Sequence, residues 1–316
     1  MKDKTKFNTP ILFLVFKRLD TTRRVFASIK RIKPAKLYLA ADGPHQGNAE
    51  EAKQCLKVRE YLKANIDWDC EIKFRENDEN LGCRYGPSSA IDWFFKHEKE
   101  GIILEDDCLP AEQFFYFCAE LLGRYRDDSR ISHIGGFNCQ NGKKRGRYSY
   151  YFSRYFHCWG WATWQRAWRG YDVDMADFND FLAERVLENI FNDIYLVAFW
   201  KDIFEATFLK QIDAWDYQWV YKNFKANQLA VVPNYNLIQN IGFCAGATHT
   251  VQESFKVPEI AKDIPQTWDK PSFLYLHKEA DAYTYKKHLG INWLYKIKYN
   301  IKRLLKYLGL IKYNRK

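Results

Sequence analysis

The sequence predicts an α/β fold whose doubly wound, mostly parallel sheet is flanked by helices. Its first third alternates short apolar runs with longer amphipathic segments, the order of repeated strand–helix units. Runs such as Ile11–Phe16, ILFLVF, are continuously apolar, as parallel strands covered on both faces are. Polar residues follow each run directly, and ligands of such sheets bind at the carboxyl ends of the strands.

The expected elements of the first third follow one another without long linkers. The expected strands are Ile11–Phe16, Leu37–Ala41, Cys70–Phe74 and Gly101–Leu104. The expected helices are Thr21–Ile32, Glu50–Ala64 and Ser88–His97. The polar clusters after the four strands are Lys17-Arg18, Asp42-Gly43-Pro44, Arg75-Glu76-Asn77 and Glu105-Asp106-Asp107. If the strands are parallel, these clusters meet at one edge of the sheet.

The second half of the chain is less regular. It contains a Gly/Lys/Arg loop, an aromatic stretch, an acidic segment, two helical runs and a strand, in the order Asn141–Arg147, Tyr148–Trp168, Asp172–Asp180, Phe191–Gln211, Asp216–Ala226 and Leu229–Val232. Near the C-terminus, apolar residues from Trp293 to Leu308 recur at helical spacing among lysines and arginines. This pattern predicts a basic amphipathic C-terminal helix.

Composition limits the class of protein. The chain has 316 residues, 47% of them apolar, which is enough for a substantial core. Its eight cysteines form no Cys-x-x-Cys pair, so we expect buried thiols rather than a zinc site or a disulfide framework. The apolar run after the N-terminus is too short for a signal peptide or a membrane span, so we expect a cytoplasmic protein. The net charge of +10 is compatible with nucleic acid, anionic membrane or a diphosphate substrate.

Three consecutive carboxylates, Glu105-Asp106-Asp107, follow the apolar run Gly101–Leu104. Such groups repel one another and resist burial unless a cation or strong donors compensate. Mg²⁺ and Mn²⁺ prefer oxygen ligands and are often held by one or two carboxylates together with substrate phosphates. The triplet therefore indicates a metal that bridges a diphosphate. The alternative is a solvated turn or a helix start, since Pro110 opens an expected helix.

The triplet is one of several ordered motifs that resemble the GT-A glycosyltransferases, particularly the N-acetylglucosaminyltransferase I type and the bacterial family-2-like proteins similar to it. The resemblance runs from Pro10 to about Thr250. Its segments are Lys17-Arg18 with Asp20-Thr-x-Arg23-Arg24, Asp42-Gly43, the triplet with Cys-Leu-Pro and Phe114-Phe115, Phe156-His-Cys-Trp-Gly160-Trp161, Trp215-Asp216-Tyr-Gln-Trp219, Pro233-Asn234, Gly242-Phe243 and Ala247-Thr248-His249-Thr250. It implies a GT-A-type fold and a nucleotide-diphospho-sugar transferase.

The resemblance also implies how a nucleotide-sugar is bound. Arg18 resembles the basic residue that contacts the nucleotide, and Asp42 the carboxylate that accepts a hydrogen bond from uracil, which favours a UDP donor. Glu105 and Asp106 are expected to position the sugar, the ribose or the backbone. Arg18 and Asp42 also have interpretations without a ligand. Arg18 is compatible with an exposed loop, and Asp42-Gly43-Pro44 with a turn.

Two further parts of the site follow from the same resemblance. Gly160 and Trp161 resemble a loop that lies against the donor or acceptor sugar, although Trp161, with helical spacing to Trp164, is also compatible with a core. Asp107 and His249 are implied as ligands of Mn²⁺ or Mg²⁺. The N-acetylglucosaminyltransferase I pattern has no obvious histidine at position 249, which leaves the ligand set open.

An inverting transfer needs a carboxylate that accepts the proton of the attacking hydroxyl. Asp216 matches the position of that general base, with Asp213 as the second candidate. The rival interpretation of Asp216 is a helix N-cap, because Trp219, Val220 and Phe224 follow at the spacing of a helix face. A capping carboxylate is a weaker base.

The predicted function is a metal-dependent glycosyltransferase of the hexosyl- or N-acetylhexosaminyl-transferase class. It would move a sugar, by an inverting reaction, from a UDP-sugar to a glycan or lipid-linked acceptor of surface polysaccharide. We expect a catalytic domain over residues 1–270, with a nucleotide-binding half to about 110 and an acceptor half from about 111, and a basic helical tail over 271–316. The tail is compatible with a contact to anionic membrane or with a solvated terminal helix that packs on the catalytic domain by one face. The alternatives are a nucleotidyltransferase acting on sugar phosphates, disfavoured because Lys17-Arg18-Leu-Asp20 lacks glycine, and a non-catalytic basic scaffold. A nucleic-acid partner is not expected.

Overall fold

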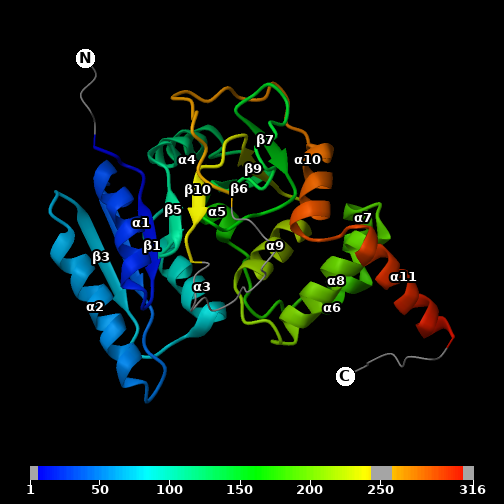
Figure 1. Cartoon of the computed structure of the whole chain (residues 1–316), viewed down its shortest axis with the longest axis horizontal. Coiled ribbons are helices and arrows are strands. Elements are labelled where there is room, and N and C mark those ends of the chain that lie inside the picture. Colours follow the sequence, from blue (N-terminus) through cyan, green and yellow to red (C-terminus); the bar gives the residue numbers. More distant parts are fainter. Residues whose placement is uncertain (1–5, 243–257, 309–316) are drawn as a thin grey trace.

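The central sheet has eight strands in the order β3-β2-β1-β4-β8-β6-β9-β7. They are β1 Ile11–Val15, β2 Lys36–Ala41, β3 Glu71–Glu76, β4 Glu100–Glu105, β6 Ile131–Gly135, β7 Tyr150–Ser153, β8 Trp161–Trp164 and β9 Leu229–Pro233. This computed structural model describes residues 6–242 and 258–308 (Figure 1). β7 and β8 run antiparallel to their neighbours and the other six strands share one direction. The predicted α/β class with a mostly parallel sheet is confirmed.

The strand order reverses beside β1. The chain builds β2 and then β3 on one side of β1, and afterwards returns to place β4 on the other side. The helices α1 Leu19–Ile32, α2 Ala49–Asn65 and α3 Gly82–Phe95 make these crossovers. Because Leu14 is in register with Glu105, the residues that follow β1 lie next to those that follow β4. This is the topological switch point, where open α/β sheets bind ligands.

The sequence of β1 explains its central place. Each of its five residues is buried, because helices pack on both faces of the sheet. α1 is amphipathic and turns Val25, Phe26 and Ile29 toward the sheet, each fully buried. One cluster of buried apolar side chains extends from Phe7 to Ala280 and joins both halves of the chain.

A two-stranded ribbon lies beside the end of β4. It pairs β5, Cys108–Pro110, with β10, Ile238–Asn240, in antiparallel register. The Ile241 amide also donates to the Asp107 carbonyl, at 2.8 Å. The ribbon therefore brings Asn240 and Gly242 to the acidic triplet.

The other helices lie mainly in the second half of the chain. They are α4 Glu112–Arg124, α5 Gln165–Trp168, α6 Phe178–Ala183, α7 Val186–Ile190, α8 Ile194–Phe208, α9 Asp216–Lys225, α10 Lys278–Tyr283, a π-helical turn Thr284–His288 and α11 Trp293–Tyr307. α8, α9 and β9 match the predicted elements to within a few residues at each end. None of the seven described cysteines forms a disulfide, and Cys244 lies outside the described residues.

The main differences from the sequence-based expectation are at α3 and in the aromatic stretch, and the strand β6 was also not predicted. α3 begins at Gly82 instead of Ser88, although Gly82, Gly86 and Pro87 all disfavour a helix interior. The aromatic stretch Tyr148–Trp168 supplies the strands β7 and β8, which were not predicted. Both strands are buried throughout, so they lack the apolar and polar alternation that marks a half-exposed strand.

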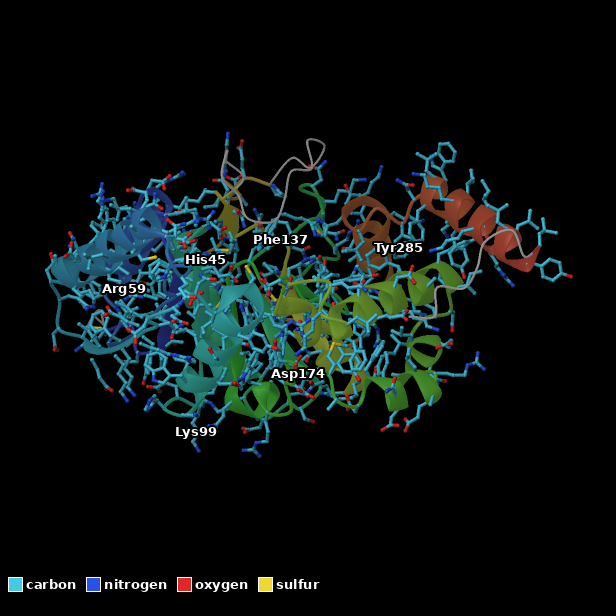
Figure 2. All side chains as sticks on the ribbon, turned by 90° about the horizontal axis from the view of Figure 1, so that it is seen from below. His45, Arg59, Lys99, Phe137, Asp174 and Tyr285 are labelled. Atoms are coloured by element: carbon cyan, nitrogen blue, oxygen red, sulfur yellow. The ribbon has the colours of Figure 1, made fainter. Side chains whose placement is uncertain are left out.

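The predicted basic amphipathic helix is confirmed as α11, Trp293–Tyr307. Figures 1 and 2 both place it at the opposite end of the molecule from α2 and β3. The last charged residues of the tail, Lys312, Arg315 and Lys316, lie outside the described residues. No helix in the described part of the chain is both long and apolar enough to cross a bilayer.

Candidate functional site

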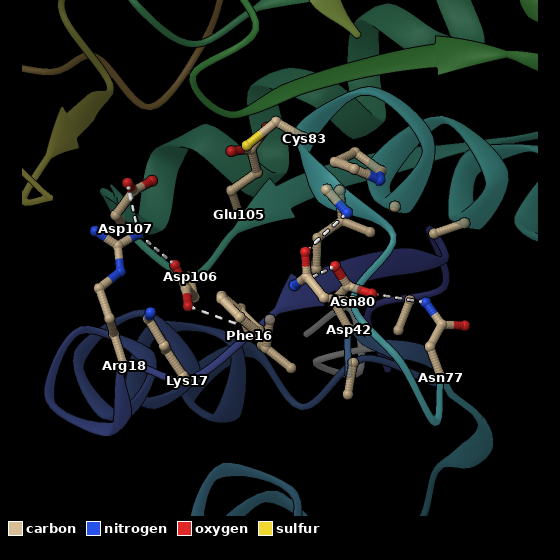
Figure 3. Close-up of a pocket in the computed structure, with 18 of the residues that line it drawn as sticks. Phe16, Lys17, Arg18, Asp42, Asn77, Asn80, Cys83, Glu105, Asp106 and Asp107 are labelled. Carbon is tan, nitrogen blue, oxygen red and sulfur yellow. Dashed lines mark hydrogen bonds and ion pairs between the residues drawn. The ribbon is translucent and has the colours of Figure 1, made fainter. Parts of the chain in front are cut away.

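A cavity of about 400 Å³ lies at the switch point between β1 and β4. Its walls come from the segments that follow β1, β2, β3 and β4, from the first turns of α3, and from Asn240 and Gly242 (Figure 3). Six residues predicted to belong to the site line it together: Arg18, Asp42, Glu105, Asp106, Asp107 and Asp213. Arg18 and Asp213, which are 195 positions apart in the sequence, thus converge on one cavity.

Arg18 and the triplet form the charged centre of the cavity. The Arg18 Nη2 atom donates to Asp106 Oδ1 at 2.7 Å and to Asp107 Oδ2 at 2.8 Å. The other oxygen of Asp106 accepts a longer hydrogen bond, 3.4 Å, from the Phe16 amide. One guanidinium therefore bridges two carboxylates, and Asp106 is also tied to the end of β1.

The triplet carries more negative charge than Arg18 balances. Burial and the neighbouring Asp107, Asp216 and Asp106 carboxylates raise the pKa of Glu105 well above its usual range. Burial also raises the pKa of Asp106 to about 6, even though Arg18 opposes this shift. Burial acts to lower the pKa of Arg18, but Asp106 and Asp107 outweigh it and raise that pKa above its usual range. A further cation would therefore balance the remaining negative charge of the triplet.

Gly242 packs directly against this centre. A Cβ atom at position 242 would overlap Asp107 Oδ2 and lie 2.9 Å from Arg18 Nη1, so only glycine fits without displacing one of them. The Gly242 amide donates to Asn240 Oδ1 at 2.8 Å. His249, predicted as a metal ligand, lies outside the described residues.

The carboxylate of Asp42 is already engaged by the protein. Oδ1 accepts from the Gly43 amide, the Leu81 amide and Asn77 Nδ2 at 3.0 to 3.1 Å. Oδ2 accepts from Asn80 Nδ2 at 3.1 Å and, more weakly, from the Leu81 amide at 3.2 Å. A carboxylate has about four acceptor positions. Asp42 therefore holds the loop between β3 and α3, and the predicted uracil contact would have to replace one of these bonds.

Asp213 caps α3 from a distant part of the chain. Its Oδ1 accepts from the Arg84 amide at 3.0 Å and its Oδ2 from the Cys83 amide at 3.3 Å. The residue before α3, Leu81, makes no side-chain cap of its own. A carboxylate at this place satisfies two free N–H groups and the positive end of the helix dipole. This capping explains why α3 can begin at Gly82.

Asp216 is the first residue of α9, and its Oδ1 accepts from the Tyr217 amide at 3.1 Å. It does not line the cavity itself, but it is near enough to contribute to the raised pKa of Glu105. The N-cap interpretation is therefore wrong, because the N-cap residue of α9 is Trp215, which makes no side-chain cap, while the general-base role of Asp216 stays a prediction.

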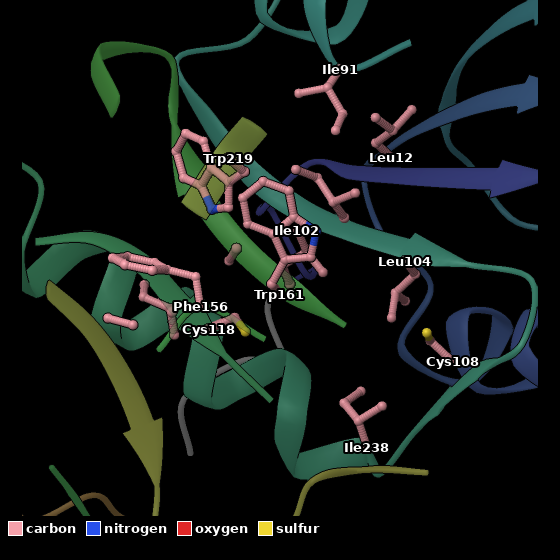
Figure 4. Packing of buried hydrophobic residues seen from close by; sticks show 14 of the residues in the cluster. Leu12, Ile91, Ile102, Leu104, Cys108, Cys118, Phe156, Trp161, Trp219 and Ile238 are labelled. Carbon is pink, nitrogen blue, oxygen red and sulfur yellow. The ribbon is translucent and has the colours of Figure 1, made fainter. Parts of the chain in front are cut away.

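Gly160 and Trp161 belong to the core rather than to the cavity wall. Trp161 is fully buried in β8, where its ring stacks on His133 at 5.0 Å and on Trp215 at 5.6 Å. Figure 4 shows its indole among Trp219, Ile102 and other buried side chains. Gly160 has φ +62°, and a Cβ there would overlap Ile238. Their neighbour Trp159 is the residue of this segment that lines the cavity.

Several cavity residues were not predicted to belong to the site. Asn77 and Asn80 orient Asp42, Lys17 pairs with Glu51 at 2.6 Å beside the cavity, and Asn240 arrives through the β5–β10 ribbon. Asn77 occurs in the polar cluster after the third strand, which was noted in the sequence without a role, and Asn80 follows three residues later. Nothing local in the sequence identifies Asn240, because its approach depends on strand pairing.

The donor atoms present fit a divalent cation that is also bound by substrate. Asp107 is the partly exposed carboxylate of the pair held by Arg18, with 17% of its side chain accessible against 7% for Asp106. Within residues 6–242 and 258–308, no three His, Cys, Asp or Glu side chains are grouped as a metal cluster. One or two carboxylates completed by phosphate oxygens is a common arrangement for Mg²⁺.

No family model matches the chain, and neither does any curated protein. Solved structures with a similar fold include a mannosyltransferase from Pyrobaculum calidifontis in complex with GDP-Man and Mn²⁺, with a TM-score of 0.37 and 13% identity over 54% of this chain and 50% of that one. HddC from Yersinia pseudotuberculosis has a TM-score of 0.30 and 9% identity over 50% and 77%. A 4-diphosphocytidyl-2C-methyl-D-erythritol synthase from Anaerococcus prevotii has a TM-score of 0.28 and 8% identity over 57% and 78%. The chain spans about half the length of the mannosyltransferase. Likenesses this weak carry no argument about function.

Proposed function

We propose that the chain is a metal-dependent glycosyltransferase that uses a nucleotide-sugar donor. The observation that carries the proposal is the incompletely balanced acidic triplet at the topological switch point, inside a cavity that also presents Arg18. A site for a neutral or purely anionic ligand would not place three carboxylates together at its centre. In a nucleoside diphosphate bound with a divalent cation, the cation balances the carboxylates and the diphosphate pairs with Arg18.

In this proposal the chain's own residues bind and orient the donor. Arg18 exchanges one carboxylate for the diphosphate, to which its planar guanidinium can donate two hydrogen bonds. Asp42 keeps the loop between β3 and α3 in place as the wall beside the nucleotide, proposed to be uridine. Asp106, tied to the end of β1, orients Arg18.

Asp107 would hold Mn²⁺ or Mg²⁺, with His249 as the second ligand that the family resemblance implies. When bound, such an ion neutralises the departing diphosphate. Asp216 is the proposed general base, because its charge is near enough to help raise the pKa of Glu105, while Asp213 uses both oxygens to cap α3. Donor binding would thus fall to residues 1–110 and acceptor activation to residues 111–270.

Donor hydrolysis tests the proposal without knowledge of the acceptor. Purified protein is incubated with UDP-, GDP-, CMP- and dTDP-sugars in the presence of Mn²⁺ or EDTA, and release of the nucleoside phosphate is measured. We expect hydrolysis of at least one donor, UDP-sugars first, that EDTA abolishes. Asp107→Asn should lower it about 100-fold or more, within the range for loss of one electrostatic group from a transition state.

Exposed Asp67, which pairs with Lys30 far from the cavity, provides the matched control, Asp67→Asn. Activity that is indifferent to EDTA, or equal in Asp107→Asn and the wild type, would remove the metal and the triplet from the mechanism. Failure of every donor to bind or hydrolyse would remove the glycosyltransferase itself.

We also propose that α11 binds an anionic membrane surface. Large apolar side chains project from it into solvent, with exposures from 46% at Ile297 to 87% at Tyr307; the others are Trp293, Leu294, Ile301, Leu304 and Leu308. Its opposite side packs on α8, where Tyr299 contacts Tyr195 and Lys296 approaches Asp193. Lysines flank the exposed apolar residues and α11 contains no acidic residue, which favours anionic lipid.

A further inference from the structure

A second cavity, of about 250 Å³, lies at the outer edge of the sheet beside β7. Its walls come from the loop 141–147, from β7 and from the segment 271–277, and they include Arg145, Arg147, Tyr148, Tyr151, Tyr275 and His277. Among residues 6–242 and 258–308, no Asp or Glu lines it. Its charge is therefore opposite to that of the acidic cavity.

The backbone of this loop is held in place by one buried amide. Asn234, which is 6% exposed and directly follows β9, accepts from the Arg145 amide at 2.7 Å. Its Nδ2 donates to the carbonyls of Arg145 and Tyr148 at 3.0 and 2.8 Å. The two arginines therefore project from an ordered loop rather than from a free one.

Both guanidinium groups keep donors for a ligand. Arg145 uses Nε for Gln140 Oε1 at 2.7 Å, and Arg147 uses Nη2 for the Tyr148 hydroxyl at 2.9 Å. Neither forms an ion pair within the described ranges, whereas Arg126 and Arg130 each pair with a carboxylate. An arginine fork without a carboxylate partner is suited to bidentate binding of a carboxylate or phosphate.

The remaining walls are aromatic. The ring of His277 lies 5.6 Å from that of Tyr151 and 6.5 Å from that of Tyr275, which is 55% exposed. Flat rings of this kind can cover the apolar face of a sugar ring. Arginine forks and aromatic faces in one cavity select for a sugar that carries a negative charge.

The second cavity lies beside β7, whose first residue is at the same edge of the sheet as the triplet. β7 begins where β4, β6 and β9 end. Asn240 lines the acidic cavity and Asn234 holds the basic loop, and these two residues are only six positions apart. Six residues of chain span at most about 22 Å. A short oligosaccharide could reach from one cavity toward the other.

We propose that this second cavity binds an anionic sugar of the acceptor glycan, with its carboxylate or phosphate on Arg145 and Arg147 and its ring against the tyrosines. Its role as an acceptor site rests on the proposed glycosyltransferase function. The binding itself does not, because it requires neither donor nor metal.

Isothermal titration tests the binding with three probes: tetragalacturonate, which carries carboxylates, glucose 6-phosphate, and neutral maltotetraose. At least one anionic probe should bind about tenfold or more tightly than maltotetraose, and the better of the two identifies the anion. Arg147→Ala and Arg145→Gln should each weaken that binding about tenfold, as expected for a hydrogen bond to a charged group. Lys57→Ala, an exposed lysine on α2 outside both cavities, is the control of equal charge and should bind as the wild type does.

Arg147 is exposed, so its replacement should leave the fold intact, which a thermal melt verifies. Equal affinity for the three probes, or unchanged affinity in both arginine variants, overturns the inference whatever the donor assay shows. Absence of donor hydrolysis together with arginine-dependent saccharide binding instead defeats the proposed function and leaves the anionic-sugar site standing.

Discussion

Arg18 lies close to where a metal ion would be needed, and its contacts suggest that it holds the triplet together until a cation and donor arrive. Its Nη2 bridges Asp106 and Asp107 at 2.7 and 2.8 Å, so a metal ion on Asp107 would share that carboxylate with the guanidinium. A positive charge a few ångströms from a cation site repels the cation by several kcal/mol at most, and less after screening. Metal binding and donor binding should therefore depend on Arg18 in opposite directions.

We predict that Arg18→Ala binds Mn²⁺ about tenfold more tightly than the wild type when no donor is present, since 1.4 kcal/mol of relieved repulsion suffices. The same variant should bind UDP-sugar more weakly because the diphosphate loses its guanidinium. Electron paramagnetic resonance of free Mn²⁺ measures the first effect, and titration calorimetry measures the second.

The control for this experiment is Arg24→Ala, which removes an equal charge from the exposed side of α1. It should leave both affinities unchanged. If Arg18→Ala binds Mn²⁺ no better than Arg24→Ala does, Arg18 does not compete with the metal ion. Another group must then balance the negative charge of the triplet.

Substitutions at Asp213 and Asp216 should have different effects, the first on stability and the second on catalysis. Asp213→Ala should lower the free energy of unfolding by about 1 kcal/mol, because α3 loses its cap. Asp216→Asn keeps the Oδ1 contact with the Tyr217 amide, so its stability should change by less than about 0.5 kcal/mol. Its transfer activity, however, should fall about 100-fold or more, as expected for loss of a general base.

Urea denaturation and transfer assays on the two variants, with Asp213→Asn as an isosteric companion, give both quantities. A fully active Asp216→Asn would transfer the base role to another carboxylate. A destabilised Asp216→Asn would mean that Asp216 mainly stabilises the start of α9.

At the scale of elements, α11 provides a test that is independent of catalysis. Ile301→Ser combined with Leu304→Ser removes two exposed apolar side chains, and each is worth about 1.5 to 3 kcal/mol when fully buried in an apolar phase. We predict that the wild type sediments with vesicles of phosphatidylcholine and phosphatidylglycerol, and that the double variant does not. Thermal stability should be unchanged, since both residues are exposed.

Charge is tested on the same helix by Lys298→Gln with Lys302→Gln, both exposed. This variant should lose about 1 kcal/mol of attraction per lysine to the anionic vesicles and nothing to vesicles of pure phosphatidylcholine. Unchanged sedimentation of both double variants would show that α11 is not the membrane contact.

The elements that the sequence predicted well pack mainly against segments that are close to them in the chain. β1, α1, β2 and α2 follow from apolar runs and helical periodicity, because each is covered by its neighbours in the chain. The start of α3 was missed because its cap, Asp213, is about 130 residues away. β8 was missed because Trp161 and Trp164 in a fully buried strand resemble one face of a helix as closely as they resemble a strand.

At the scale of the whole molecule, the candidate site depends on contacts that no local pattern reveals. Arg18, Asp42 and the triplet were identified because each directly follows a strand, and parallel strands end at one edge. Asn240 and Gly242 reach the same cavity through the β5–β10 pairing. Trp161 was expected beside a sugar, but its stacking on His133 and Trp215 places it in the core, which explains why an aromatic motif alone is a poor guide to a binding site.

The packing around His133 links stability to pH. His133 on β6 is fully buried, and its Nδ1 accepts from Trp219 Nε1 on α9 at 3.2 Å while its Nε2 lies 3.1 Å from the His157 carbonyl. Nδ1 must be unprotonated to accept, so Nε2 carries the proton and the ring is neutral. Burial lowers the pKa of His133 to about 3. This residue therefore joins β6, α9 and the segment before β8 only in its neutral form.

We predict that His133→Gln is less sensitive to acid than the wild type, because glutamine can accept from Trp219 and donate to His157 without titrating. The unfolded chain has a histidine pKa of about 6.5, above the folded value, so the His133 contribution is complete above about pH 6.5 and is lost as pH falls toward 3. Each pH unit in that window should cost the wild type about 1.4 kcal/mol more than the variant. Urea denaturation followed by tryptophan fluorescence at several values between about pH 7 and pH 4.5 measures the difference. Other groups, such as Asp281 with its raised pKa, titrate equally in both proteins and cancel. Parallel stability curves would show that His133 is protonated in the folded state and that the Trp219 contact does not fix its tautomer.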